Sequence, residues 1–205
     1  SSISIPKLAG GKYDFDTPYN RVGSDCARWD SPPLRYPDDT FKFGMGVASM
    51  DFECAPCITQ ALQERVKHHS WGYLSTTEGL RNGILRWNGE RHGVDLDPDS
   101  VVISDGVYPG MIAAMRAFVP RGSKLLLSTP AYSGFYTMAR AANVEIVDSQ
   151  MEYKNGRYEI NWDDLESKMT PDIRAMIVCN PQNPTGNVWR EEELLRVGRL
   201  CLDHN

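Results

Sequence analysis

Two consecutive asparagine–proline steps form the motif that points most clearly to chemistry. They lie in residues 179–186 (CNPQNPTG), directly after an apolar run that predicts a buried strand at residues 175–179. Each proline keeps the residue before it extended and prevents the strand from continuing. Open α/β sheets bind their ligands at the carboxyl ends of the strands. One such step would indicate only a turn, whereas a doubled step followed by Thr-Gly favours a binding function.

A glycine turn that opens into a helix gives a second candidate site at residues 104–110 (SDGVYPG). The first N–H groups of a helix have no partner within the helix, so they attract an anion such as phosphate. Many strand-turn-helix joints are only turns, and the motif alone is weak. It matches neither GxGxxG nor a Walker loop, which disfavours a dinucleotide or a nucleoside triphosphate.

An aromatic residue follows another predicted strand, within residues 128–135 (STPAYSGF). Core packing is the usual fate of such a tyrosine. At the ligand-bearing edge of a sheet, however, the ring of Tyr132 could stack on a flat heterocycle.

The elements that must position these motifs follow an alternating pattern. After Pro98, short apolar runs alternate with amphipathic stretches, which is typical of parallel strands joined by helices. Strands are expected at residues 101–104, 124–128, 144–147 and 175–179, and helices at 108–119, 133–142, 162–169 and 190–204. Two earlier helices are expected at residues 55–71 and 78–92, the second with Leu80, Ile84, Leu85 and Trp87 turned inward. Residues 1–39 read as an arm without periodicity.

Composition narrows the class of protein. The 205 residues are 41% apolar and carry a formal charge of -5, which favours a soluble globular protein and disfavours a nucleic-acid partner. No stretch reaches the ~18 apolar residues of a membrane span. The five cysteines are too few and too irregular for a disulfide framework, so a reducing cytoplasm fits best. Cys54 and Cys57 form a CxxC that is expected to be structural, and no metal site is expected.

The three motifs together resemble the fold-type I pyridoxal-5′-phosphate (PLP) enzymes of the aspartate-aminotransferase superfamily. The resemblance implies an α/β fold, with a mixed, mostly parallel sheet flanked by helices, that is incomplete in this chain. Residues 1–54 would form the N-terminal arm and part of the small domain, and residues 55–205 the first part of the large PLP-binding domain. It also implies that Asn183 would hydrogen-bond the phenolic oxygen of PLP, that Tyr132 would stack on its ring, and that the N–H groups of Gly106 and Val107 would hold its phosphate.

Further segments resemble the cystathionine β-lyase branch, often called the MalY/PatB type. They are Tyr13-Asp14-Phe15-Asp16, Val47-Ala48-Ser49-Met50-Asp51-Phe52, Trp71-Gly72-Tyr73, Arg86-Trp87, Arg91-His92-Gly93 and Asn187-Val188-Trp189. In that branch the residue matching Tyr73 reaches the partner subunit's cofactor phosphate, and the loop around Ala48 lies beside the substrate carboxylate. A homodimer is therefore implied. Ser49, Gln182 and Asn187 stand where Asp, His and Arg are usual, which leaves the substrate open.

PLP enzymes need a lysine as Schiff-base partner and general base. The family places this lysine, and the acid that pairs with the pyridine nitrogen, beyond Asn205. The lysines of this sequence all lie in polar contexts: Lys7, Lys12, Lys42, Lys67, Lys124, Lys154 and Lys168. Without the missing parts the chain is expected to be inactive. It is an excerpt of a longer protein, one of two chains that complete each other, or a degenerate fragment.

Three functions stay open. The leading hypothesis is a carbon–sulfur β-lyase that releases a thiol, pyruvate and ammonia from a cysteine-type amino acid. The nearest alternative is an aminotransferase that uses the same cofactor, since residues 183–186 are equally typical of aminotransferases. The third is a non-catalytic interaction protein on the same fold, which the presence of Tyr132 and Asn183 disfavours.

Overall fold

The computed structural model describes residues 13–73, 75 and 77–204. Contacts divide the chain into two units, Ser1–Ser75 and Thr76–Asn205, and each is described by itself. The domain division expected at residues 54 and 55 stays a prediction. None of the helices in the described ranges is long and apolar enough to cross a membrane.

Within residues 13–73 and 75, the first unit contains two helices, α1 (Ser31–Arg35) and α2 (Pro56–Val66). Pro56 occupies the first helical position of α2, where the N–H that proline lacks would have no helical partner. The prediction that this helix extends to residue 71 was wrong, because α2 ends at Val66 and His69 adopts a left-handed backbone with φ 55°.

The second unit contains the sheet and the helices that cover it. Its elements run in the order α3 (Glu78–His92), η1 (Pro98–Ser100), α4 (Val107–Phe118), β1 (Lys124–Thr129), α5 (Gly134–Ala142), β2 (Glu145–Gln150), β3 (Glu152–Lys154), β4 (Arg157–Glu159), α6 (Trp162–Ser167), β5 (Ile173–Ile177) and α7 (Glu191–Asp203). The main sheet has the order β2-β1-β5, and both pairings of β1 are parallel. The predicted α/β class is therefore confirmed.

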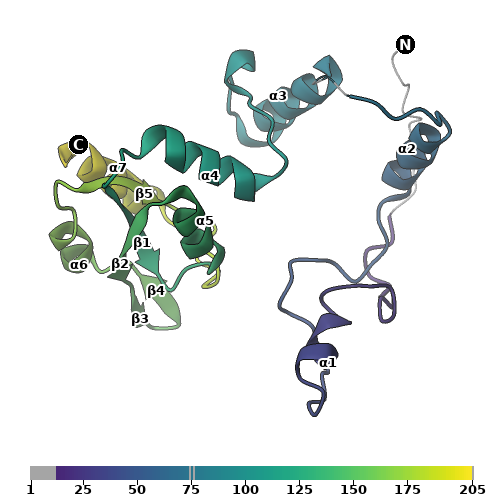
Figure 1. Cartoon of the computed structure of the whole chain (residues 1–205), viewed down its shortest axis with the longest axis horizontal. Coiled ribbons are helices and arrows are strands. Elements are labelled where there is room, and N and C mark those ends of the chain that lie inside the picture. Colours follow the sequence, from purple (N-terminus) through teal and green to yellow (C-terminus); the bar gives the residue numbers. More distant parts are fainter. Residues whose placement is uncertain (1–12, 74, 76, 205) are drawn as a thin grey trace. The chain divides into compact units, whose positions relative to one another are not determined.

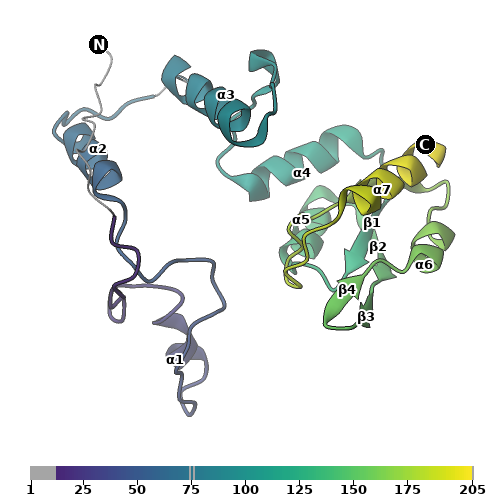
Figure 2. The same cartoon turned by 180° about the vertical axis from the view of Figure 1, so that it is seen from behind.

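Alternating side chains of the central strand β1 build two cores. Leu125 and Leu127 pack with Met115 of α4 and Met138 of α5 on one face. Leu126 packs on the other face, with side chains from α6, α7 and the loop before α7. Figures 1 and 2 show the same layering, with α5 and α7 on opposite sides of the sheet. Burial on both faces explains why β1 reads as a continuous apolar run.

A small antiparallel hairpin, β3 with β4, was not predicted. Its strands pair with Tyr153 opposite Tyr158. The turn between them is Asn155-Gly156, and both residues have positive φ, 52° and 80°. This dipeptide is the strongest short-range signal for a hairpin, so the sequence did contain the information.

Two further predictions were wrong. Residues 101–104 form no strand in the described structure. The strands on either side of β1 in the sheet are β2 and β5. In α3 the predicted bounds are confirmed, but Leu80 and Trp87 are exposed and none of the helix's residues is buried. A β-propensity or an amphipathic face needs a packing partner before it produces a strand or a buried surface.

Candidate functional site

The N-terminus of α4 forms the first part of the site. Gly106 precedes the helix with φ 134° and ψ 171°, a conformation that favours glycine. No side chain caps this end, and Val107, the first helical residue, is exposed. The N–H groups of Val107 and Tyr108 belong to the first turn, where no helical carbonyl can accept from them. The helix end can therefore bind an anion through its backbone.

A side-chain relay ties this helix end to the start of α5. The hydroxyl of Tyr108 lies 2.9 Å from Thr137 Oγ1, and Thr137 donates to the carbonyl of Gly134 over 2.9 Å. Gly134 in turn lies under the ring of Tyr132, because a Cβ at position 134 would come within 2.1 Å of Tyr132 Cε1. Tyr132 as a whole residue is 41% exposed, so it is packed in part and accessible in part.

Gln182 fastens the Asn-Pro loop to the end of β1. The residue is only 4% exposed, and its Nε2 donates to the carbonyl of Pro130 over 3.0 Å and to that of Ser128 over 3.5 Å. The loop closes on itself through the Gln182 N–H, which donates to the Asn187 carbonyl over 2.7 Å. Asn183 lies at the exposed side of this fixed loop and makes no hydrogen bond within the described residues.

Trp189 fixes the exit of the same loop. Its Nε1 donates to the Cys179 carbonyl over 2.9 Å, and its backbone N–H donates to Asn180 Oδ1 over 3.1 Å. The Asn187 side chain donates to the Tyr158 carbonyl in the hairpin. Asn180 and Asn187 are thus structural, which leaves Asn183 as the asparagine that is presented outward.

These contacts connect three of the predicted site segments at one edge of the sheet. The segment of Tyr132 follows the carboxyl end of β1, and Asn183 follows that of β5. The relay through Thr137 adds the helix end at Gly106. Backbone donors for a phosphate, a partly exposed ring and an outward amide fit a flat, phosphorylated heterocycle such as PLP. The sequence identified these residues but missed Gly134 and the Tyr108–Thr137 contact; a glycine two residues after Tyr132 was the available signal.

Ala48 and Tyr73 belong to the first unit, and both are exposed. Tyr73 is fully accessible, at 109%. The predicted roles of these two residues stay predictions.

The described lysines do not provide a catalytic amine. Lys124 forms ion pairs with Asp172 at 3.0 Å and Glu145 at 3.5 Å, and its hydrogen bond with Asp172 raises the pKa of the ammonium further. Lys168 pairs with Asp164 at 2.9 Å. Lys42, Lys67 and Lys154 are exposed. Lys7 and Lys12 lie outside the described residues.

The two cysteines of the CxxC pair are both free thiols. Ala55, between the two cysteines, is extended with ψ 130°, which places Cys54 outside the helix that contains Cys57. The Tyr13 hydroxyl donates to Cys57 Sγ over 3.5 Å. Within the described ranges no three His, Cys, Asp or Glu side chains cluster closely enough to hold a metal ion.

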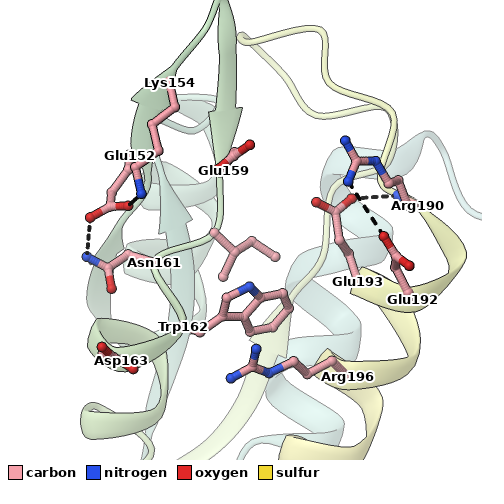
Figure 3. A pocket seen from close by; sticks show the side chains of 11 residues that line it. Glu152, Lys154, Glu159, Asn161, Trp162, Asp163, Arg190, Glu192, Glu193 and Arg196 are labelled. Carbon is pink, nitrogen blue, oxygen red and sulfur yellow. Dashed lines mark hydrogen bonds and ion pairs between the residues drawn. The ribbon is translucent and has the colours of Figure 1, made fainter.

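A polar groove of about 710 Å³ lies elsewhere in the second unit, between the hairpin, the start of α6 and α7. In Figure 3, Trp162 lies at its centre with Arg196 beneath it, and the Arg196 guanidinium stacks 4.2 Å from the Trp162 ring centroid. Arg190 pairs with Glu192 at 3.5 Å, and Lys154 pairs with Glu152. None of the predicted cofactor residues lines this groove. We therefore do not assign it as the candidate cofactor site, although it is large.

The fold and the site together define an α/β protein whose candidate site lies at the carboxyl edge of its parallel sheet. Comparison with known proteins identifies the family. Residues 40–205 match the aminotransferase class I and II family, and the chain belongs to that family.

Among the relatives and solved structures that resemble this chain are proteins named as cystathionine beta-lyases and as a C-S lyase. The chain is 34% identical to cystathionine beta-lyase PatB from Bacillus subtilis, over 93% of this chain and 49% of that protein. It is 29% identical to the protein MalY from Escherichia coli, over 94% of this chain and 50% of that protein. The PLP-containing structure of cystalysin from Treponema denticola superimposes with a TM-score of 0.85 at 27% identity, over 94% of this chain and 50% of that one. The chain thus spans about half the length of these relatives.

Proposed function

We propose that this chain is part of a PLP-dependent carbon–sulfur β-lyase that acts on cysteine-type amino acids. When bound, PLP supplies an electron sink for the negative charge that develops at the α-carbon of an amino acid. The products are a thiol, pyruvate and ammonia. The observation that carries the proposal is the similarity to PatB, at 34% identity. An aspartate aminotransferase from Pyrococcus horikoshii is 23% identical over a shorter part of the chain.

The residues at the edge of the sheet have distinct tasks in this proposal. The N–H groups of Gly106 and Val107 bind the cofactor phosphate, where the helix end favours negative charge. The accessible part of the Tyr132 ring stacks on the pyridine ring, and Gly134 leaves the space that this ring position needs. The Asn183 amide donates to the phenolic oxygen of the cofactor, held in place by the bonds of Gln182.

The resemblance supplies the proposed roles of two residues of the first unit. Ala48 borders the pocket for the amino-acid substrate, and Tyr73 reaches the cofactor phosphate of the partner subunit in a cytoplasmic homodimer. We expect the Schiff-base lysine in the full-length protein, beyond Asn205. Aminotransferase activity is the second candidate, since the matching family carries that name.

Pyruvate formation separates the two functions. The full-length protein that contains this chain is incubated with PLP and L-cystathionine, with and without an added keto acid. A β-lyase releases pyruvate even when no keto acid is added. An aminotransferase consumes the added keto acid and releases no pyruvate. Asn183→Ala should reduce pyruvate release. Glu192→Ala, which removes an exposed carboxylate from the groove of Figure 3, should not. If the wild-type protein released no pyruvate, the proposal would be contradicted.

A further inference from the structure

A single arginine holds both ends of the loop that contains Ala48. The Arg28 guanidinium donates to the carbonyls of Gly44 and Ser49, which flank Ala48 in the sequence. The same guanidinium forms an ion pair with Asp51, with 3.4 Å between Nη1 and Oδ2. The Arg28 side chain is only 18% exposed, so these bonds are partly shielded from water.

The partner carboxylate of this arginine is itself held in place. Asp51 Oδ1 accepts from Trp29 Nε1 over 3.0 Å, and the Asp51 carbonyl accepts from the Tyr19 N–H over 2.6 Å. Arg21 adds a bond to the Met50 carbonyl over 3.0 Å. Residues 19–29 therefore form a scaffold against which residues 44–51 are ordered, although neither segment contains a helix or strand.

The residue type at position 44 is part of the same arrangement. A Cβ at Gly44 would lie 2.8 Å from Arg28 Cγ and 2.9 Å from the Arg28 carbonyl, so any other residue would displace the arginine stem or its backbone. A Cβ at Gly46, two residues further along, would meet nothing within 4 Å. Neither glycine has a positive φ. The two positions thus differ in their contact with Arg28 and not in backbone strain.

We propose that Arg28 is a positioning residue for substrate binding, which orders residues 44–49 so that Ala48 is presented to the amino-acid substrate. The inference rests on the proposed function, because it assigns Ala48 to the substrate pocket. In this role Arg28 acts through the loop, by its bonds to Gly44, Ser49 and Asp51. Its planar group can donate to two carbonyls and a carboxylate at once, which the single ammonium of a lysine does less well. Without it the loop must be ordered when substrate binds, and that cost weakens binding.

The test uses the full-length protein and two matched pairs of variants. Arg28→Met removes the donors and keeps most of the stem, and Arg35→Met makes the same change at an exposed position of α1. Gly44→Ala adds a methyl group against Arg28, and Gly46→Ala adds one in open space. For each variant the measurements are KM and kcat for pyruvate release from L-cystathionine, PLP absorbance, and hydrogen exchange of the amides in residues 44–51.

Arg28→Met and Gly44→Ala should raise KM about tenfold, with kcat within about twofold of the wild type. Both should speed hydrogen exchange in residues 44–51 and leave PLP absorbance unchanged. Arg28→Lys should lie between Arg28→Met and the wild type, and the two control variants should resemble the wild type. An unchanged KM, or unchanged exchange, in Arg28→Met would overturn the role of Arg28. A wild type without PLP or pyruvate release would instead refute the proposed function, while the exchange data would still report whether Arg28 orders the loop.

Discussion

Replacing Gln182 by methionine tests whether one buried amide fixes the Asn-Pro loop. The variant keeps the length and shape of the side chain and removes the N–H that donates to the Pro130 carbonyl over 3.0 Å. The contact with the Ser128 carbonyl, at 3.5 Å, is at the limit of a hydrogen bond and adds little. A lost hydrogen bond that leaves a partly buried acceptor without a donor costs about 1 to 3 kcal/mol. We expect Gln182→Met to lower the free energy of unfolding by about 1 to 2 kcal/mol.

Urea unfolding of the protein without cofactor measures this loss, and all variants are compared at the same protein concentration so that any effect of mass action is equal. With a slope of about 2 kcal/mol per molar urea, the midpoint should fall by about 0.5 to 1 M. Gln150→Met, at an exposed position of β2, should change stability by less than about 0.5 kcal/mol. PLP affinity should also fall in Gln182→Met, because Asn183 loses its support. Stability and PLP affinity equal to those of the wild type would refute the reasoning.

Three further predictions concern other parts of the chain. Gly156→Ala should destabilise the protein by about 1 kcal/mol, because Gly156 has a φ of 80° in the hairpin turn. Gly198→Ala, in the middle of α7 where a Cβ meets nothing within 4 Å, should instead stabilise the protein by about 0.5 to 1 kcal/mol. Urea unfolding measures both changes in stability, and equal effects of the two variants would contradict the turn argument. For Asp164, burial raises the carboxyl pKa, but hydrogen bonds from Lys168, Ser149 and the Gln150 N–H outweigh burial and hold the pKa below its usual value. The ionised carboxylate therefore stabilises the protein above its unfolded pKa of about 3.9, and this stabilisation is lost as the pH falls through the folded pKa. Asp164→Asn should make the free energy of unfolding depend less on pH below about pH 5. An unchanged pH dependence would exclude this carboxylate as a cause of the loss of stability in acid. Asn183→Ala should leave stability within about 0.5 kcal/mol of the wild type while weakening PLP binding, and calorimetry with and without cofactor separates the two effects.

Local signals in the sequence were sufficient for most helices. The bounds of α3 are confirmed because Thr77 caps its start by accepting from the Leu80 N–H, and Gly93 ends it with a left-handed φ of 65°. Such capping depends only on neighbouring residues. The strands β1, β2 and β5 were also found within a few residues, since each contains a short apolar run. Only in β1 does this run reflect burial on both faces of the sheet.

Non-local packing explains the failures. Residues 101–104 have the composition of a strand, but a strand also needs a neighbour to bond with, and a single sequence does not specify that neighbour. For the site, the rule that ligands bind at the carboxyl ends of strands placed Tyr132 and Asn183 on one edge of the sheet. It could not show that Gln182 ties the two loops together, because that bond joins residues 52 positions apart.

The most direct test of the cofactor site compares PLP with pyridoxal, which lacks the phosphate. The full-length protein is titrated with each compound, and uptake is followed by absorbance. The account predicts saturable binding of one PLP per chain and at least about tenfold weaker binding of pyridoxal, because charge-assisted bonds at the start of α4 hold the phosphate. No PLP uptake, or equal affinity for both compounds, would contradict a phosphate site at Gly106 and Val107.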